Sequence, residues 1–430
     1  MKKLKSLIKD YKKRIIRNKR SAIVFLLIFS FFVFLRFYQM EERNIFGWDQ
    51  VDYAWAAKNI IVDHKFPLMG TQAKLNSGIF IGPLYYYYIA LFYFITDLDP
   101  IASGIAAGFT GIITFFIIFF VTKNIFSRGA AFIAVFLYTV SYAAISADRV
   151  EWPVNFIFPL SLLIFYSLYK IVIGKVKYIL LLVLLVGFSF STHFTAVFYP
   201  FIILLSLPLF PRTRETFKYV VYSIPIFFIV FSPILINLFH DNGFLGKSST
   251  SYVNTYYHGL HLRRVFQLTK DAFIQFEHLL FFPQLKYLGL VGLPLFGLVY
   301  LKGKLNRNRI LFVYLSALWF LVPWFIFSLY SGEISDYYFL ISRPIVVLIL
   351  SYFIYRLMIH PLASVKAIAI IVLIGYLVVN FNEFLKVKRG NLSGYREHVL
   401  IKINNKEKIK FKQGAPESYI YYIYKERHEK

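Results

Sequence analysis

Long apolar runs, separated by short basic connections, are the main pattern along this chain. Eleven of the runs come close to the roughly 20 residues that an α-helix needs to cross a lipid bilayer. They occupy residues 21–40, 101–122, 129–147, 156–173, 178–193, 194–210, 218–239, 284–301, 309–330, 338–358 and 364–381. The pattern predicts an all-α polytopic membrane protein with about 11 transmembrane helices.

One further apolar stretch, residues 83–96, decides how the chain is threaded. If it spans, the basic connection 123–128 lies outside and the acidic residues 148–151 lie inside, which opposes the bias of Lys and Arg toward the cytoplasm. If it lies along the membrane surface, the basic connections between the runs all become cytoplasmic. Its length is short for a span, and its four tyrosines 85–88 suit the headgroup region, so the surface position is favoured. The outer loops are then residues 41–100, 147–155, 240–283 and 331–338.

This topology divides the chain into three parts. Residues 1–20 carry ten Lys and Arg and form a cytoplasmic N-terminus. The apolar run that follows lacks a small-residue cleavage site, so we expect an uncleaved first helix. Residues 21–381 form the membrane domain, whose first outer loop, 41–100, contains juxtamembrane helices. Residues 382–430 form a polar tail that we expect on the outer side.

The overall composition agrees with a membrane protein. Of 430 residues, 58% are hydrophobic and 16% charged, and the mean hydropathy is +0.60, which excludes a soluble globular protein. The 48 Lys and Arg exceed the 22 Asp and Glu by 26. On a soluble protein such an excess suggests nucleic acid, but here the basic residues cluster between apolar runs and indicate topology instead. Cysteine is absent, which excludes disulfides, thiolate metal sites and a thiol nucleophile.

A first pair of acidic residues stands where the chain first leaves the predicted membrane. Asp49 and Asp52 are three residues apart near the start of a predicted short helix, 48–62, so their carboxylates share one face. They can cap this helix and interact with its dipole. A carboxylate at the boundary between water and lipid can also act as a general base for an acceptor hydroxyl. The two roles are compatible.

A second charged cluster, Asp148, Arg149 and Glu151, falls in the next outer loop. These residues can simply end one helix before Pro153 opens another. They also offer the groups that hold a phosphate, a sugar or a metal ion. Asp49, Asp148 and Glu151 would supply hard oxygen ligands to a divalent metal ion, although no spacing in the sequence demands one.

Three other polar positions stand out between or inside the apolar runs. His193 is predicted at the outer end of a helical hairpin, either packed in the core or facing a cavity where it binds a phosphate or sugar hydroxyl. Arg343 lies just inside a span, where arginine is costly, and phosphate is its natural partner unless it snorkels to the interface. The segment with His258, Arg263 and Arg264 has no metal-ligand spacing and is predicted to be a lid or an interfacial surface.

The first outer loop contains two motifs, Asp49-Gln50 ahead of Asp52-Tyr53-Ala54-Trp55, and Gly82-Pro83-Leu84-Tyr85-Tyr86-Tyr87. These motifs resemble those of the GT-C membrane glycosyltransferases, in particular the protein O-mannosyltransferases and the lipid A aminoarabinose transferases. The likeness continues through Arg149, Trp152-Pro153 and Asn155 to Asp336-Tyr337-Tyr338-Phe339-Leu340 and Pro344, and it covers most of residues 20–350. This family usually carries Asp-Glu at the first motif, so only Asp49 inherits its catalytic role.

The resemblance implies transfer of a sugar from a polyprenyl-phosphate donor to a hydroxyl of a protein, lipid or glycan. The reaction would take place on the extracytoplasmic face of a prokaryotic cell membrane. Asp49 would be the base, and Asp148 would be a second catalytic residue. Lys74 and Arg343 would stabilise the lipid phosphate as it leaves. The remaining predicted substrate-binding residues are Asp52, Tyr85, Arg149, Glu151, His193 and Tyr338.

Two other classes of membrane protein handle the same lipid-linked sugars. A flippase or secondary transporter should place its binding groups at mid-membrane in broken helices, often with inverted repeats, whereas the acidic residues here fall in loops. An O-antigen ligase or polymerase would use a large late outer loop, and the segment around Arg263 and Arg264 keeps that alternative open. A scaffolding protein would leave the acidic loops unexplained.

Overall fold

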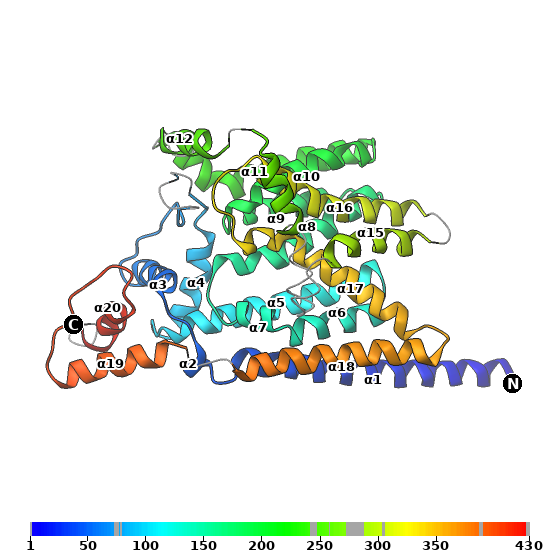
Figure 1. The fold of residues 1–430 in the computed structure, drawn as a ribbon, viewed down its shortest axis with the longest axis horizontal. Helices are drawn as coiled ribbons and strands as arrows, with labels where there is room; N and C mark the ends of the chain where they lie inside the picture. The colour runs from blue at the N-terminus through cyan, green and yellow to red at the C-terminus, as the bar shows by residue number, and fades with distance from the viewer. Residues whose placement is uncertain are drawn as a thin grey trace.

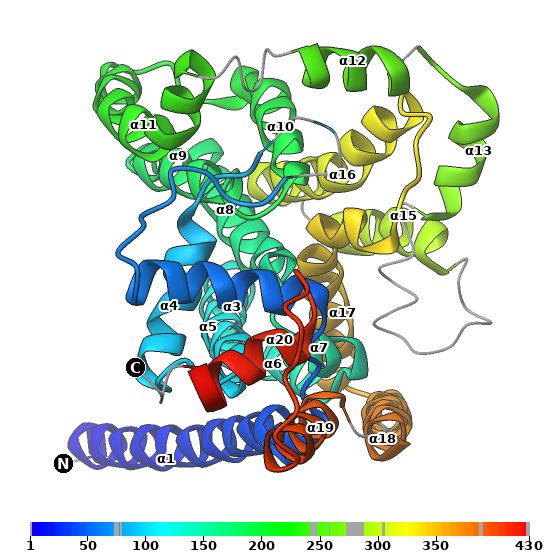
Figure 2. The same ribbon diagram turned by 90° about the vertical axis from the view of Figure 1, so that its left-hand side faces the viewer.

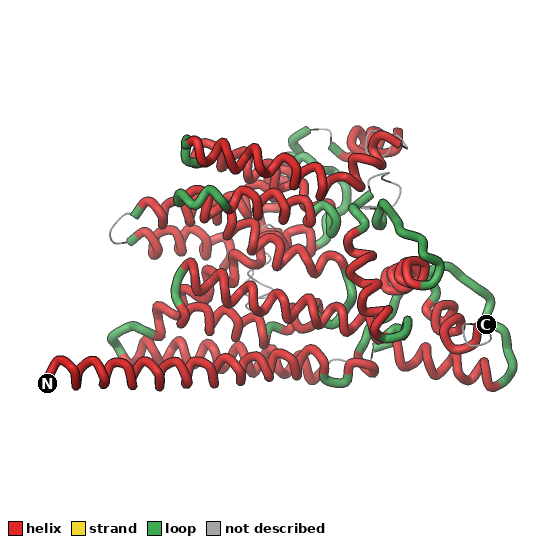
Figure 3. Tube along the Cα trace, turned by 180° about the vertical axis from the view of Figure 1, so that it is seen from behind, coloured by secondary structure: helices red, strands yellow, loops and turns green. Residues whose placement is uncertain are grey.

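In the computed structural model, residues 2–72, 77, 80–240, 247–257, 259–271, 288–302, 306–386 and 390–426 are described. The secondary structure of this part is helical (Figure 3), apart from the isolated bridges that join Gln72 to Phe80 and Tyr257 to Tyr330. The predicted all-α fold is therefore confirmed. A continuous backbone hydrogen-bond ladder inside each helix is what a chain of this hydropathy requires in lipid.

The eleven predicted apolar runs are mainly helical over their described residues. Seven helical stretches of the described chain are long and apolar enough to cross a membrane, and other apolar helices are shorter. Breaks at Ser141 and His193 shorten two runs. The corresponding elements are α1 (Lys2–Phe37), α5 (Ile101–Ile125), α6 (Arg128–Val140), α7 (Tyr142–Ala147), η1 (Pro153–Phe156), α8 (Ile157–Val172), α9 (Tyr178–Ser189), η2 (Phe194–Val197), α10 (Phe198–Ser206), η3 (Leu207–Leu209), α11 (Arg214–His240), α15 (Leu288–Leu301), α16 (Arg307–Ser328), η5 (Asp336–Ser342), α17 (Arg343–Met358) and α18 (Ala363–Lys386).

Two helices of the first outer loop lie across one end of this bundle (Figures 1 and 2). Helices α3 (Trp48–Ile61) and α4 (Leu84–Ile95) run crosswise to α5, α8 and α17 (Figures 1 and 2). They pack through Tyr53 and Tyr85, whose rings meet edge to face at 5.0 Å. The position of residues 83–96 along the membrane surface stays a prediction. A short α2 (Met40–Arg43) connects α1 to this layer.

The C-terminal segment is part of the folded structure. Helices α19 (Leu392–Asn404) and α20 (Pro416–Tyr421), with η6 (Tyr422–Glu426), pack on α3 and form a second hydrophobic core. Tyr419 is fully buried there, and its hydroxyl donates a hydrogen bond to the carbonyl of Leu98 over 2.9 Å. The polar composition of the tail concealed this core, because only a few apolar side chains of α19 and α20 build it.

The N-terminus and the C-terminal helices lie at opposite ends of the molecule (Figure 1). Figure 1 shows the N-terminus at one end of the bundle and α3, α19 and α20 at the other. Helices α12 (Lys247–Tyr256) and α13 (Leu262–Asp271) lie along a further edge near α16 (Figure 2). The bundle thus presents α3, the start of α4 and the C-terminal segment together at one end.

Candidate functional site

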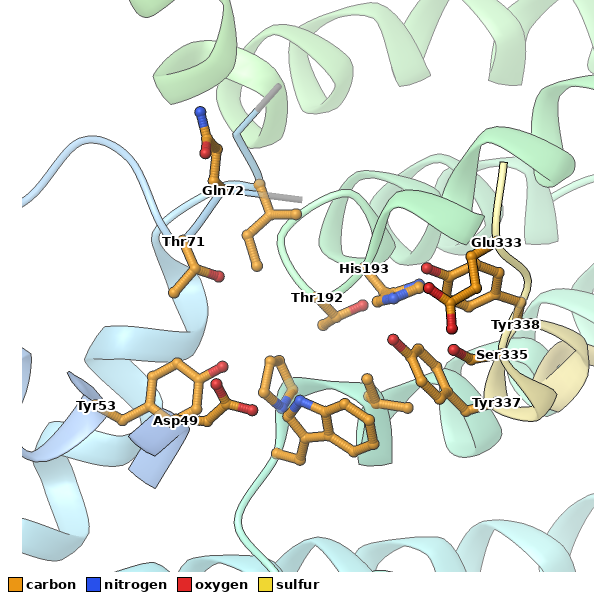
Figure 4. A pocket seen from close by; sticks show the side chains of 14 residues that line it. Asp49, Tyr53, Thr71, Gln72, Thr192, His193, Glu333, Ser335, Tyr337 and Tyr338 are labelled. Atoms are coloured by element: carbon orange, nitrogen blue, oxygen red, sulfur yellow. The ribbon is translucent and has the colours of Figure 1, made fainter. Parts of the chain in front are cut away.

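A cavity of about 400 Å³ lies where four loops and helix ends meet (Figure 4). The first outer loop supplies one wall, and the connections before η1, η2 and η5 supply the others. The lining residues are Asp49, Tyr53, Thr71, Gln72, Ile81, Trp152, Pro153, Val154, Thr192, His193, Glu333, Ser335, Tyr337 and Tyr338. Three of the predicted site residues, Asp49, His193 and Tyr338, are therefore brought together.

Asp49 stands in the first turn of α3, with its carboxylate toward the cavity (Figure 4). Partial burial raises the pKa of Asp49 above its ordinary value. A carboxylate with a raised pKa is a stronger base toward a hydroxyl proton. The position therefore combines access to the cavity with increased basicity.

The hydrogen bonds of the Gln50 side chain explain why this chain has an amide, and not an acid, directly after Asp49. Its Oε1 accepts a hydrogen bond from the backbone N–H of Gly47 over 3.0 Å. Its Nε2 donates to the backbone carbonyl of Glu151 over 2.6 Å. An ionised Glu at this position has no proton to donate, so it could not make the second bond. Gln50 thus ties the two acidic loops together.

Glu151 is fully buried beside this link and does not line the cavity. Its Oε1 accepts from the Tyr85 hydroxyl over 3.4 Å, while Oε2 has no hydrogen-bond partner among the described residues. Burial raises the pKa of Glu151 well above its ordinary value, and the nearby Asp49 and Asp52 carboxylates raise it further. The protonated carboxyl is the form that this environment favours.

Asp148 belongs to a buried ion-pair cluster. Its Oδ2 lies 3.0 Å from Nε of Arg36, and its Oδ1 accepts from the Tyr138 hydroxyl over 2.8 Å. Arg343 is also buried and interacts electrostatically with Asp148. Neither Asp148 nor Arg343 lines the cavity. Asp148 at the C-terminal end of α7, Arg36 of α1 and Arg343 of α17 thus join these three helices beneath the outer loops.

Arg149 binds the C-terminal end of α1. Its guanidinium donates to the carbonyls of Arg36 over 2.9 Å and of Tyr38 over 3.0 Å, with longer bonds to Leu35 and Gln39. Helix C-termini leave such carbonyls without partners, and a cation there also interacts favourably with the helix dipole. The observed contacts of Arg149 are therefore those of a helix cap.

The wall opposite Asp49 is aromatic. The rings of Trp152 and Tyr337 meet at 4.7 Å, and His193 lies 5.7 Å from the rings of both Tyr337 and Tyr338. Nδ1 of His193 accepts from the Thr195 backbone N–H over 3.2 Å, which places the ring proton on Nε2. Burial lowers the pKa of His193, so the ring is neutral near pH 7.

Buried hydrogen bonds fix the element that carries Tyr337 and Tyr338. The indole Nε1 of Trp319 donates to Oγ of Ser161, which donates to the carbonyl of Ile341 in η5. Oγ of Ser342 donates to the carbonyl of Trp319 over 2.6 Å. These bonds hold η5 between α8 and α16, and thus hold the aromatic wall in place.

Glu333 is a cavity residue that the sequence motifs did not single out. It lies in the loop before η5. Arg264 of α13 supports this loop by donating hydrogen bonds to the carbonyls of Tyr330, over 3.1 Å, and Gly332. The available signal was an acid in the last predicted outer loop, but its proximity to the first loop depends on the fold.

The other predicted residues lie near the cavity or outside the described chain. Tyr85 is buried and contacts Glu151, and Asp52 lines a second pocket on α3. Lys74 and His258 lie outside the described residues, although Gln72 and Ile81, on either side of Lys74 in sequence, both line the cavity. Within the described part, no three acidic or histidine side chains form a metal-binding cluster, so Asp49, Asp148 and Glu151 do not form one.

Comparison with known proteins agrees with the motifs of the first loop. The model of the family described as dolichyl-phosphate-mannose-protein mannosyltransferase matches residues 81–237. No curated protein sequence matches the chain. The family match therefore includes α4, the second acidic loop and the His193 connection.

Solved structures share the fold at low sequence identity. ArnT from Cupriavidus metallidurans bound to undecaprenyl phosphate has a TM-score of 0.57 and 10% identity, over 92% of this chain and 74% of that chain. AglB, an oligosaccharyltransferase of Archaeoglobus fulgidus in complex with an inhibitory peptide and a dolichol-phosphate, has a TM-score of 0.54 and 13% identity. That match covers 90% of this chain and 58% of AglB. The chain has the fold of the GT-C membrane glycosyltransferases, and the predicted resemblance is confirmed.

Proposed function

We propose that this protein transfers a sugar from a polyprenyl-phosphate donor to a hydroxyl-bearing acceptor, in the cavity that Asp49 lines, on the extracytoplasmic side of a prokaryotic cell membrane. The observation that carries this proposal is the position of Asp49, a carboxylate of raised pKa facing an aromatic and polar cavity in a GT-C fold. ArnT, which shares this fold, binds undecaprenyl phosphate. The basic connections lie at the opposite end of the bundle, and this separation supports the proposed sidedness.

The proposed reaction needs one base. Asp49 accepts the proton of the acceptor hydroxyl as the hydroxyl oxygen forms a bond to C1 of the sugar. The bond between C1 and the phosphate oxygen breaks, and its electron pair leaves with the polyprenyl phosphate. Because a phosphate is a stable anion, its departure requires positive charge nearby but no proton donor.

The aromatic wall would hold the sugar. Trp152 and Tyr337 line the cavity, and the negative electrostatic potential of an aromatic ring face suits the C–H groups of a sugar ring. His193 and Ser335 offer hydrogen bonds to sugar hydroxyls. The sugar would thus lie between this wall and the carboxylate of Asp49.

Lys74 is the proposed partner of the lipid phosphate. It belongs to the segment that joins the cavity residues Gln72 and Ile81. We infer that Arg149 and Arg343 act differently, by holding the helices beneath the loops, because Arg149 caps α1 and Arg343 lies in the buried cluster of Asp148. In this proposal Asp148 supports the site through Arg36 and does not touch the substrate.

Turnover of a short-chain polyprenyl-phosphate sugar by the purified protein tests this proposal. Release of polyprenyl phosphate should depend on wild-type protein and fall by roughly 10²–10⁴ in Asp49→Asn. Asp97→Asn is the matched control, because Asp97 does not line the cavity and asparagine tolerates its left-handed φ of 54°. Equal activity of Asp49→Asn and Asp97→Asn would contradict the assignment of the base. Addition of EDTA to the same assay tests the metal ion separately.

A further inference from the structure

A second pocket, of about 620 Å³, lies on the other side of α3. Its walls come from α3, the chain after α3, the start of α4 and the C-terminal segment before α20. The lining residues are Trp48, Asp52, Trp55, Ala56, Asn59, Lys65, Phe66, Pro67, Tyr86, Phe411, Gln413 and Gly414. This volume falls within the roughly 300–1,000 Å³ of small-molecule sites.

Large aromatic side chains of this pocket are exposed. Trp48 is 61% exposed, Phe66 63% and Phe411 70%. The rings of Trp55 and Phe411 pack edge to face, with centroids 5.7 Å apart and planes at 68°. Exposed apolar side chains gathered at one concave place indicate a binding surface. Flat aromatic faces of this kind suit the C–H side of a sugar ring.

The polar groups between these rings suit hydroxyl groups. Asp52 accepts a hydrogen bond from the Tyr86 hydroxyl over 3.3 Å and retains further acceptor capacity. Asn59 and Gln413 carry amides, which both donate and accept, as sugar hydroxyls do. The charged groups in the lining are one carboxylate and one ammonium, from Asp52 and Lys65, so the pocket carries no strong excess of either sign.

The C-terminal wall is held in a defined position. Gly414 has a φ of +72°, which favours glycine, and a Cβ added there would overlap the Trp48 indole. The backbone N–H of Lys412 donates to Oγ of Ser418 over 2.9 Å, which connects this loop to α20. The loop therefore lies close against Trp48, and the pocket is formed in advance of any ligand.

We propose that this second pocket binds a saccharide, the glycan part of the acceptor. Helix α3 separates the two sites: Asp49 and Tyr53 line the first cavity, and Asp52 and Trp55 line the second. A glycan held on Trp48 and Phe411 would direct a neighbouring hydroxyl toward Asp49. The role of this glycan as acceptor rests on the proposed function, whereas saccharide binding stands without it.

Binding is measured first, on the full-length protein in detergent. Mannotriose and maltotriose, as neutral probes, are titrated while intrinsic tryptophan fluorescence is recorded, since Trp48 and Trp55 line the pocket. At least one of them should bind saturably, and Phe411→Ala should weaken that binding at least tenfold. Phe266→Ala is the control, because Phe266 of α13 is 78% exposed and lies outside the pocket. Binding of a serine-rich hexapeptide in place of both saccharides would overturn the saccharide assignment, as would equal affinity in wild type and Phe411→Ala.

Turnover then separates the two proposals. Phe411→Ala should raise KM for a glycan acceptor at least tenfold, while hydrolysis of the polyprenyl-phosphate sugar by water stays at the wild-type rate. An unchanged acceptor KM would overturn the acceptor role of the pocket. If wild-type protein binds a saccharide through Phe411 but consumes no donor, the proposed function fails and the saccharide site remains.

Discussion

At the scale of single residues, two carboxyl groups close to one another have different environments. Asp49 lines a cavity and is partly exposed, whereas Glu151 is fully buried with one oxygen unpaired among the described residues. Burial raises the pKa of both, and that of Glu151 more strongly. Two carboxyl groups with separated pKa values can remain in different protonation states at one pH. We therefore expect the ionisation of Asp49 to appear in the pH dependence of turnover. The ionisation of Glu151 should appear in the pH dependence of stability.

The pH profile of turnover should show the raised pKa of Asp49. A base must be ionised, so the rate of transfer should fall as the pH drops through this pKa, with a midpoint above the ordinary Asp value of about 4. kcat/KM for the donor, measured from acid to neutral pH, checks this. An acid limb that persists unchanged in the residual activity of Asp49→Asn would assign it to another group.

The pH dependence of the stability of the protein should report the ionisation of Glu151. Its folded pKa is raised, so its stabilising contribution is complete below the unfolded pKa of about 4.3 and is lost as the pH rises through the folded pKa. Glu151→Gln keeps an acceptor for the Tyr85 hydroxyl and cannot ionise. We expect the Tm of Glu151→Gln in detergent to exceed the wild-type Tm by a margin that grows with pH. The exposed Glu397→Gln should show no such trend, and a constant margin would contradict an ionising Glu151.

At the scale of elements, the loops of the site are held by bonds to helix ends and to each other. Gln50 links α3 to the carbonyl of Glu151, and Arg149 caps α1 two residues earlier in that second loop. The first motif predicted the position of Asp49, because an acid at the start of a helix near a membrane is visible in sequence. The contact of Arg149 with α1 could not be predicted from the sequence, since it joins residues more than 100 positions apart.

Arg149→Ala should destabilise the fold rather than weaken donor binding. Loss of the charged hydrogen bonds to the end of α1 leaves its last carbonyls, that of the buried Arg36 among them, without this partner, at a cost of roughly 1.5–3 kcal/mol. Thermal unfolding should show a lower Tm, while KM for the polyprenyl-phosphate sugar, measured on folded protein, stays unchanged. Lys74→Ala should raise this KM, because Lys74 is the proposed partner of the lipid phosphate. A raised KM in Arg149→Ala at wild-type Tm would return Arg149 to the phosphate site predicted from its motif.

At the scale of the whole molecule, hydropathy predicted the helices and missed the second core. Spanning runs such as 101–122 are easy to recognise, because a membrane requires long stretches without charge. The C-terminal segment is mostly polar, and its contribution depends on a few apolar side chains, such as Leu392 and Tyr419, that meet α3 from far along the chain. The second pocket was unpredictable for the same reason, since Phe411 and Trp48 come together only in the folded protein.

The arrangement of the two ends leads to a prediction about topology. In Figure 1, α5 runs from the layer of α3 and α4 toward the end of the bundle that carries the N-terminus, and α19 lies at the opposite end, beside this layer. The basic connections favour the cytoplasm for the first end, so the second end, with both pockets, should face outward. The chain has no cysteine, so a single introduced cysteine reports one position.

Asn124→Cys and Asn405→Cys form a matched pair for this test, because both asparagines are exposed and stand at the C-terminal ends of α5 and α19. In intact cells, an impermeant maleimide should label Asn405→Cys and should label Asn124→Cys only after the membrane is permeabilised. Labelling of both from one side would contradict the placement of the two ends across the membrane. The reverse pattern would place Asp49 and both pockets in the cytoplasm, and the proposed extracytoplasmic transfer would then be wrong even if the fold and the base are right.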